Sequence, residues 1–180
     1  MKISDLVQDN GYLVVANIPY YITSRIIRKL LEETVKPREI ILTIQYEVAQ
    51  RVCADSGKLN LLALSVLMYG NPGLETRIPA GAFYPPPKVD SAVIKIDLYP
   101  EPLLPAEQRE MFFQLVKAGF LHKRKTLRNS LSKGLGWSPN RASALLNSVG
   151  IDPSRRAETL SLEEWIHLTS AYDKISMKNS

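Results

Sequence analysis

An alternation of apolar runs and amphipathic segments over residues 12–68 constrains the fold of this chain more than any other feature. Residues 12–16 (YLVVA) and 39–45 (EIILTIQ) are apolar runs of strand length, and residues 23–33 between them place apolar side chains at helical spacing. Two further helical patterns follow, at residues 46–53 and 59–68. This alternation indicates an open α/β sheet with parallel strands. Because the first run is continuously apolar, it predicts a strand buried on both faces.

The pattern changes near residue 70, where two strand-like segments follow one another without a helix between them. They cover residues 71–79 and 91–99, and the second alternates polar with apolar side chains. This alternation predicts an antiparallel strand with one polar face, near the edge of the sheet. Three successive prolines at positions 85–87 stiffen the connection between the two strands.

Prolines at positions 100, 102 and 105 mark the expected end of the α/β part. Helical patterns cover the rest of the chain, at residues 106–120, 123–133, 139–149 and 162–175. Ser161 and Glu164 have the spacing of a capping box at the start of the last helix. We therefore expect an α/β domain over residues 1–102 and a small all-α domain over residues 103–180.

The net charge of +5 is carried entirely by the expected helical domain. Residues 1–102 contain 11 basic and 11 acidic side chains, whereas residues 103–180 contain 12 basic and 7 acidic ones. One strongly basic half is typical of a protein that contacts nucleic acid there. The alternative is a solvated basic helix face, which fits the same composition.

The composition disfavours several classes of protein. No apolar stretch approaches the roughly 20 residues that a membrane-spanning helix needs, and the N-terminal residues lack the pattern of a secretory signal. The single cysteine, Cys53, cannot form an internal disulfide, and the two histidines, His122 and His167, are isolated. The sequence therefore predicts no membrane partner and no metal site, and it favours a reducing cytoplasm.

The sharpest candidate for chemistry is Asn17-Ile18-Pro19-Tyr20, directly after the first apolar run. Ligands of open α/β sheets bind beyond the carboxyl ends of the strands. There the Asn17 amide oxygen and a carbonyl near Ile18 can accept both N–H groups of an adenine amine and aim its lone pair at an electrophile. Pro19 fixes the backbone, and Tyr20 offers a flat face to an extruded base. A simple strand-to-helix turn is the alternative, because a four-residue pattern is common.

A second aromatic candidate lies in the proline-rich segment at residues 83–91 (FYPPPKVDS). Successive prolines form a stiff, extended segment, which can hold Phe83 as a wall opposite Tyr20. Lys88 in the same segment is a candidate phosphate contact. A polyproline connection between two strands, without a function, explains the same spacing.

A run of basic residues without acids covers positions 117–133, where six side chains are Lys or Arg. Leu121, Leu127 and Leu131 are expected to anchor one helix while its cations face outward, as in helices that follow a phosphate backbone. The complete absence of acidic residues favours this interpretation over a solvated face.

Five motifs, in order along the chain, resemble the KsgA family of ribosomal RNA small-subunit adenine dimethyltransferases. They are NIPYYIT (17–23), QYEVAQR (45–51), FYPPPKVDSAV (83–93), KRKTLRNSL (123–131) and GIDPSRRAETLS (150–161). The resemblance implies a Rossmann-like class I methyltransferase domain followed by a small helical domain. It also implies S-adenosylmethionine-dependent dimethylation of N6 of two adjacent adenosines near the 3′ end of small-subunit ribosomal RNA, in ribosome biogenesis.

The same resemblance assigns roles to individual residues. Asn17, Ile18, Pro19 and Tyr20 match the catalytic loop, and Phe83 matches a second aromatic on the target base. Asn17 and Pro19 would also lie at the methyl end of the cofactor. The RNA-facing candidates are Lys88, Lys123, Arg124, Lys125, Arg128, Arg155 and Arg156. The implied partner is small-subunit ribosomal RNA within the pre-30S particle.

The chain departs from the family pattern on its N-terminal side. The family has a glycine-rich loop after its first strand, but here no strand pattern precedes Tyr12, and the Gly-x-Gly at 134–136 follows a basic helix. Most of the S-adenosylmethionine site is therefore expected to lie in a missing N-terminal part. An apolar strand at 12–16 without that neighbour would leave an open sheet edge, through which we expect self-association. A smaller departure is Tyr46, where relatives often carry lysine.

Three alternatives remain open at this point. A catalytically incompetent RNA-binding or assembly module would keep the basic part without a cofactor site. A DNA adenine methyltransferase shares the style of the loop at 17–20 but gives no reason for the segment at 83–93. A large-subunit erythromycin-resistance methylase shares the fold and the loop, but the tail at 150–161 is more similar to the small-subunit enzyme.

Overall fold

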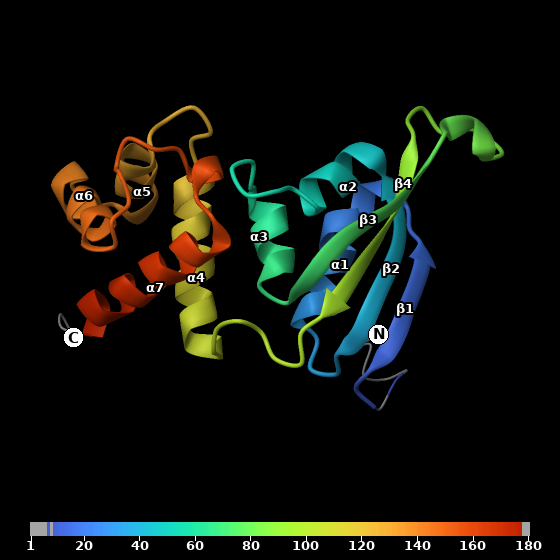
Figure 1. Cartoon of the computed structure of the whole chain (residues 1–180), viewed down its shortest axis with the longest axis horizontal. Helices are drawn as coiled ribbons and strands as arrows, with labels where there is room; N and C mark the ends of the chain where they lie inside the picture. The colour runs from blue at the N-terminus through green and yellow to red at the C-terminus, as the bar shows by residue number, and fades with distance from the viewer. Residues whose placement is uncertain (1–6, 8, 178–180) are drawn as a thin grey trace. The chain divides into compact units, whose positions relative to one another are not determined.

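The computed structural model describes residue 7 and residues 9–177, and the chain divides into two compact units (Figure 1). The first unit contains the residues up to 53 together with 65–103, and the second contains 54–64 together with the residues from 104 onward. The sequence pattern placed residues 54–64 in the α/β part instead. No helix within the described residues is long and apolar enough to cross a membrane.

A four-stranded mixed sheet forms the first unit, with the strands in the order β1-β2-β4-β3. The strands are β1 (Tyr12–Asn17), β2 (Pro37–Gln45), β3 (Gly70–Ile78) and β4 (Ser91–Leu98). β1 and β2 run parallel, whereas β4 is antiparallel to both β2 and β3. The predicted antiparallel strand is thus β4, which lies one strand in from the edge.

Helices cover one face of this sheet. They include α1 (Thr23–Glu32) and α2 (Tyr46–Val52) (Figure 1). The next helix along the chain is α3 (Leu61–Leu67). The core lies under these helices, where alternate residues of β2 and β4 are fully buried: Ile40, Leu42, Ile44, Ala92, Ile94 and Ile96. From α1, the buried side chains Ile27, Leu30 and Leu31 repeat at helical spacing and complete the layer.

The burial of β1 differs from the prediction. Its residues alternate between half-buried and exposed, and Val15 is 71% exposed. The predicted burial on both faces is wrong because, among the described residues, helices cover only one face, and successive side chains of a strand point to opposite faces. Leu13 and Val15 are therefore open to solvent. An apolar run reports the chemistry of the side chains but not whether a second layer covers them.

Four helices form most of the second unit. They are α4 (Ala106–Phe120), α5 (Leu127–Leu135), α6 (Pro139–Ser148) and α7 (Leu162–Met177). Phe112 and Trp165 are the largest side chains of their fully buried core. Gly119 is required where α4 passes Trp165, because a Cβ there would lie 2.5 Å from the indole ring. The predicted capping box is present: the Glu164 amide donates to Ser161 Oγ at 3.2 Å, and the Ser161 amide donates to Glu164 Oε2 at 2.8 Å.

The helix predicted over residues 123–133 begins only at Leu127. Thr126 caps it with its side chain, and the residues before Thr126 form a turn. Leu127 and Leu131 are fully buried, as expected of anchoring residues. The same expectation for Leu121 is wrong, because this side chain lies in the turn and is 56% exposed.

Candidate functional site

One pocket in the first unit brings together two loops that are far apart in the sequence. It has a volume of about 370 Å³ and lies between the loop after β1 and the loop that joins β3 to β4. Its lining residues are Asn17, Ile18, Pro19, Tyr20, Phe83, Tyr84, Pro85 and Pro87. All five residues that the sequence analysis assigned to catalysis therefore meet in one pocket, whereas Lys88 is exposed outside its lining.

The first wall of the pocket begins where β1 ends. Asn17 is the last residue of β1 and is exposed, while the buried side chain of Ile18 anchors the loop. Pro19 has φ −57° and ψ 134°, and its carbonyl accepts the Ile22 amide at 3.2 Å at the start of a 3₁₀ turn, η2 (Tyr20–Ile22). The proline ring and the turn together fix the directions of the loop carbonyls.

The hydroxyl group of Tyr20 is within hydrogen-bonding distance of a side chain of β4. Its hydroxyl oxygen lies 2.7 Å from the Ser91 hydroxyl oxygen, and either group can donate the hydrogen bond. Ser91 is the first residue of β4 and is completely buried. The tether therefore restricts a ring that lines the pocket to one orientation.

The second wall of the pocket, the loop between β3 and β4, is fixed at its base by Asp90. Its carboxylate accepts the Ala80 amide at 2.9 Å and the Arg77 Nε at 2.9 Å. The Ala80 amide, and then Arg77, hold the pKa of the Asp90 carboxyl below its ordinary value. Arg77 also lies over the Tyr46 ring, 4.6 Å from its centroid, and the Tyr46 amide donates to the Asp90 carbonyl. Asp90 thus joins the two ends of the loop that carries Phe83.

No role was predicted for Asp90 or Ser91, although both lie in the motif at 83–93. One signal was available for Asp90, because an aspartate at the end of a loop often accepts nearby backbone amides. No signal was available for Ser91, because its partner Tyr20 is brought to it only by the folding of the sheet.

The basic candidates of the second unit lie on a short turn and on the helix that follows it. Residues 123–125 are exposed in the turn before α5, and Arg128 is exposed on the first turn of α5. The Leu127 amide donates to the Arg155 carbonyl at 2.6 Å. The Arg128 amide donates to the Pro153 carbonyl at 3.2 Å. These bonds place the motif at 150–161 beside the motif at 123–131.

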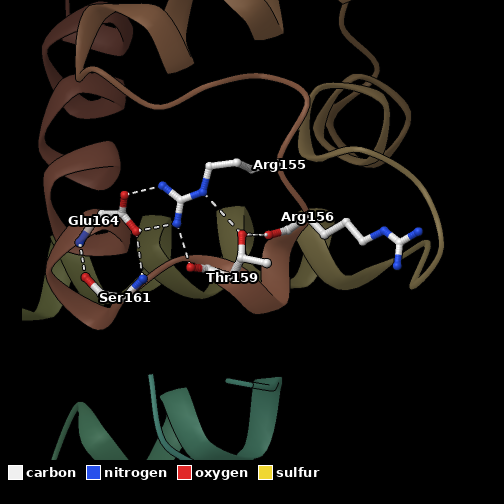
Figure 2. Close-up of polar contacts among 5 residues, drawn as sticks. All are labelled: Arg155, Arg156, Thr159, Ser161 and Glu164. Carbon is white, nitrogen blue, oxygen red and sulfur yellow. Dashed lines mark hydrogen bonds and ion pairs between the residues drawn. The ribbon is translucent and has the colours of Figure 1, made fainter. Parts of the chain in front are cut away.

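The two neighbouring arginines of the motif at 150–161, Arg155 and Arg156, have different surroundings (Figure 2). The Arg155 guanidinium forms an ion pair with Glu164 and donates to Thr159. The Arg156 side chain is exposed and extends away from Glu164. Both arginines were predicted to face RNA, but the structure gives them different surroundings. The Arg155 guanidinium is engaged by Glu164 and Thr159 of the same unit, whereas that of Arg156 is exposed.

The fold defines the class to which the chain belongs, that of Rossmann-like methyltransferases with an added helical unit. The chain matches the 23S rRNA methyltransferase ErmE with a TM-score of 0.71 and 25% identity, over 91% of this chain and 66% of that one. It shares its fold with a dimethyladenosine transferase from Plasmodium falciparum, with a TM-score of 0.79 and 22% identity, over 92% of this chain and 68% of that one. The predicted fold class is thereby confirmed.

The family model described as ribosomal RNA adenine dimethylase matches residues 3–174, and the chain belongs to this family. It is 50% identical over 165 residues to ribosomal RNA small subunit methyltransferase A of Dehalococcoides mccartyi (strain CBDB1), covering 92% of this chain and 57% of the relative. It is 45% identical over 163 residues to the protein of the same name from Syntrophotalea carbinolica, covering 89% and 61%. The chain thus spans less than two thirds of the length of these relatives, and the resemblance inferred from the five motifs is confirmed.

Proposed function

We propose that the protein acts in the S-adenosylmethionine-dependent dimethylation of N6 of two adjacent adenosines near the 3′ end of small-subunit ribosomal RNA. The observation that carries this proposal is the pocket in which the loop Asn17–Tyr20 meets Phe83. Membership of the ribosomal RNA adenine dimethylase family supports it, as do the names of the curated relatives. The reaction would belong to ribosome biogenesis in the cytoplasm, with the pre-30S particle as the partner.

The amine of the target adenine is a poor nucleophile because its lone pair is delocalised into the ring. The Asn17 side-chain oxygen accepts one of its N–H groups. We assign the other N–H group to the Ile18 carbonyl, next to Asn17 in the same loop. Held in this way, the lone pair would be directed toward the electrophilic methyl group that S-adenosylmethionine supplies when bound. The amine gives up one proton for each methyl group that it gains.

Two aromatic rings hold the base while this happens. Tyr20, tethered to Ser91, and Phe83 both line the pocket. An adenine extruded from its RNA stack recovers about 1–3 kcal/mol by stacking on a protein ring. Extrusion costs least for an unpaired base, so the pocket favours adenosines in a loop or a single strand.

We assign to the pocket a target base and the methyl end of the cofactor, and we place the rest of the cofactor outside it. Small-molecule sites range from about 300 to 1,000 Å³, and this pocket of about 370 Å³ lies near the lower limit. The described residues that line it include no acidic side chain that would bind a ribose. Asn17 and Pro19 are therefore assigned to the methyl end of S-adenosylmethionine alone.

RNA binding is assigned to exposed cations. In the second unit these are Lys123, Arg124, Lys125, Arg128 and Arg156, and in the first unit Lys88 lies beside the pocket. Cations on a turn and on the first turn of a helix suit the phosphate backbone, which they position without reading its sequence.

A chimera tests the proposed function. The chain would replace the corresponding 165 residues of the Dehalococcoides mccartyi relative, to which it is 50% identical. We expect the chimera to form N6,N6-dimethyladenosine at two adjacent positions of unmodified small-subunit RNA, detected by mass spectrometry of the digested RNA. A folded chimera that binds RNA but transfers no methyl group would favour an RNA-binding module instead.

Loss of the tether between Tyr20 and Ser91 should slow methyl transfer without weakening RNA binding. In the chimera, we expect Ser91→Ala to lower kcat about tenfold, because a misplaced ring misaligns the base. Tyr20→Phe removes the same hydrogen bond from the other side and should lower kcat to a similar extent. A Tyr20→Phe protein with full activity beside an impaired Ser91→Ala protein would mean that Ser91 acts in another way.

The uncovered face and edge of β1 should cause self-association of the isolated chain. β1 is an edge strand of the sheet formed by the described residues, and it exposes Leu13 and Val15. We expect light scattering to detect dimers or larger species, and Val15→Lys to shift them toward monomer. Val89→Lys adds the same charge at an exposed valine in a loop and serves as the control. A sharp monomer for the unmodified chain would contradict the prediction.

A further inference from the structure

The segment between α6 and α7 presents its two neighbouring arginines to different surroundings. Residues 150–156 follow α6, and a 3₁₀ turn, η4 (Ala157–Thr159), leads to the start of α7. Arg156 is exposed, whereas Arg155 is partly buried and turns toward Glu164 (Figure 2). These two adjacent arginines therefore differ in exposure and in the direction of their side chains.

Arg155 is tied to the N-terminus of α7 through Glu164. Its Nη2 donates to Glu164 Oε2 at 2.9 Å, and its Nη1 forms an ion pair with Oε1. The same carboxylate accepts the Ser161 amide at 2.8 Å within the capping box. The hydrogen bonds from Arg155 are the largest influence that holds the pKa of the Glu164 carboxyl below its ordinary value. The carboxylate is therefore charged at neutral pH, and Arg155 is joined to a helix end.

Thr159 extends this network to the backbone of Arg156. The Arg155 guanidinium donates to the Thr159 carbonyl and, through Nε, to the Thr159 hydroxyl at 3.2 Å. That hydroxyl donates in turn to the Arg156 carbonyl at 2.8 Å. We call the contacts of Arg155 with Thr159 and Glu164 the clasp. The clasp fixes the backbone that carries Arg156.

The same segment occupies the first amides of α5. The Leu127 amide donates to the Arg155 carbonyl, and the Arg128 amide donates to the Pro153 carbonyl. The Asn129 amide is taken by the helix cap. A helix N-terminus binds an anion through free amides, so this one is already satisfied. An RNA phosphate at this surface must be bound by side chains.

We propose that Arg155 is a positioning residue that does not contact RNA, and that its clasp holds Arg156 beside the basic turn at residues 123–125 to bind the RNA phosphate backbone. The inference rests on the proposed RNA-binding function. An Arg155 side chain turned toward RNA would give up four hydrogen bonds to Thr159 and Glu164. It would also release the segment that places Arg156.

RNA-binding titrations of single and double variants test this division of roles. We expect Arg156→Gln to lower the affinity for single-stranded RNA about three- to tenfold and to flatten the slope of log K against log salt by about 0.7. Arg155→Met, which keeps the length of the apolar stem, should lower the affinity about threefold, and this loss should vanish in the Arg156→Gln background. Glu164→Gln should also weaken binding, although it removes a negative charge.

Two outcomes would overturn the inference. If the losses from Arg155→Met and Arg156→Gln add, Arg155 contacts RNA itself. If Glu164→Gln leaves binding unchanged or strengthens it, the clasp does not serve Arg156. Failure of the proposed function looks different: neither Arg156→Gln nor Lys123→Gln with Arg124→Gln would then alter the affinity. In that case hydrogen exchange at the Leu127 amide tests whether Arg155 holds the segment in place. Exchange that is no faster in Arg155→Met than in the parent protein would show that the clasp does not fix this backbone.

Discussion

Replacement of Asn17 by alanine is expected to lower methyl transfer by about 10²–10³-fold, the usual effect of removing one preorganised hydrogen-bonding group from a reacting centre. In the proposed mechanism the amide oxygen at the end of β1 accepts an N–H of the target amine, and its removal would leave that amine unaligned. RNA affinity should stay within about twofold of the parent, because phosphate contacts supply most of it. Single-turnover transfer and RNA anisotropy titrations of the chimera would measure the two effects separately.

A matched control is available on the same sheet. Asn71 is exposed near the start of β3 and does not line the pocket, so Asn71→Ala should change neither quantity. Equal losses of transfer and RNA affinity in Asn17→Ala would mean that Asn17 serves binding rather than chemistry.

Charge reversal in the basic turn is expected to have the opposite effect. Lys123→Glu with Arg124→Glu should weaken RNA binding by about 100-fold at low salt. It should also make the slope of log K against log salt shallower by about 1.4, because two phosphate contacts to a single strand are lost at about 0.7 each. Transfer at saturating RNA should be nearly unchanged, because neither residue lines the pocket. Titrations over a series of salt concentrations would measure both the affinity and the slope.

The control for this prediction is an equal change of net charge elsewhere in the same unit. Lys58 and Lys174 are exposed and lie outside the turn, so Lys58→Glu with Lys174→Glu should have a much smaller effect. If the two double variants weaken binding equally, RNA responds to net charge and the turn has no special role.

Periodicity predicted the elements of the fold well, because local side-chain patterns reflect local burial. The helix at Ala106–Phe120 has the bounds that its pattern predicted. The pattern failed where burial depends on distant parts of the chain, as at Val15, whose exposure reflects an uncovered sheet face. It also failed at residues 123–126, where the basic and apolar pattern predicted a helix. The helix begins only at Leu127, because the Thr126 side chain caps it there.

The candidate site was predictable to the same degree. Asn17 and Phe83 were found from motifs, and the folded sheet brings both to one pocket. The contacts that hold two other candidates, Tyr20 and Arg155, were not predicted, because their partners Ser91 and Glu164 are set by tertiary structure. A motif indicates which side chains gather, whereas the fold decides which of them are free to meet a ligand.

The assignment of residues 54–64 to the helical unit makes the chain cross between its units at three points rather than one. Leu59 in that segment is almost completely buried, and its amide donates to the Glu158 carbonyl at 3.2 Å. A helical fragment that begins after Leu103, at the last crossing, would lack the segment 54–64. The two units therefore cannot be exchanged by a single junction. A hybrid protein that takes its helical unit from a relative must also take the relative's counterpart of residues 54–64.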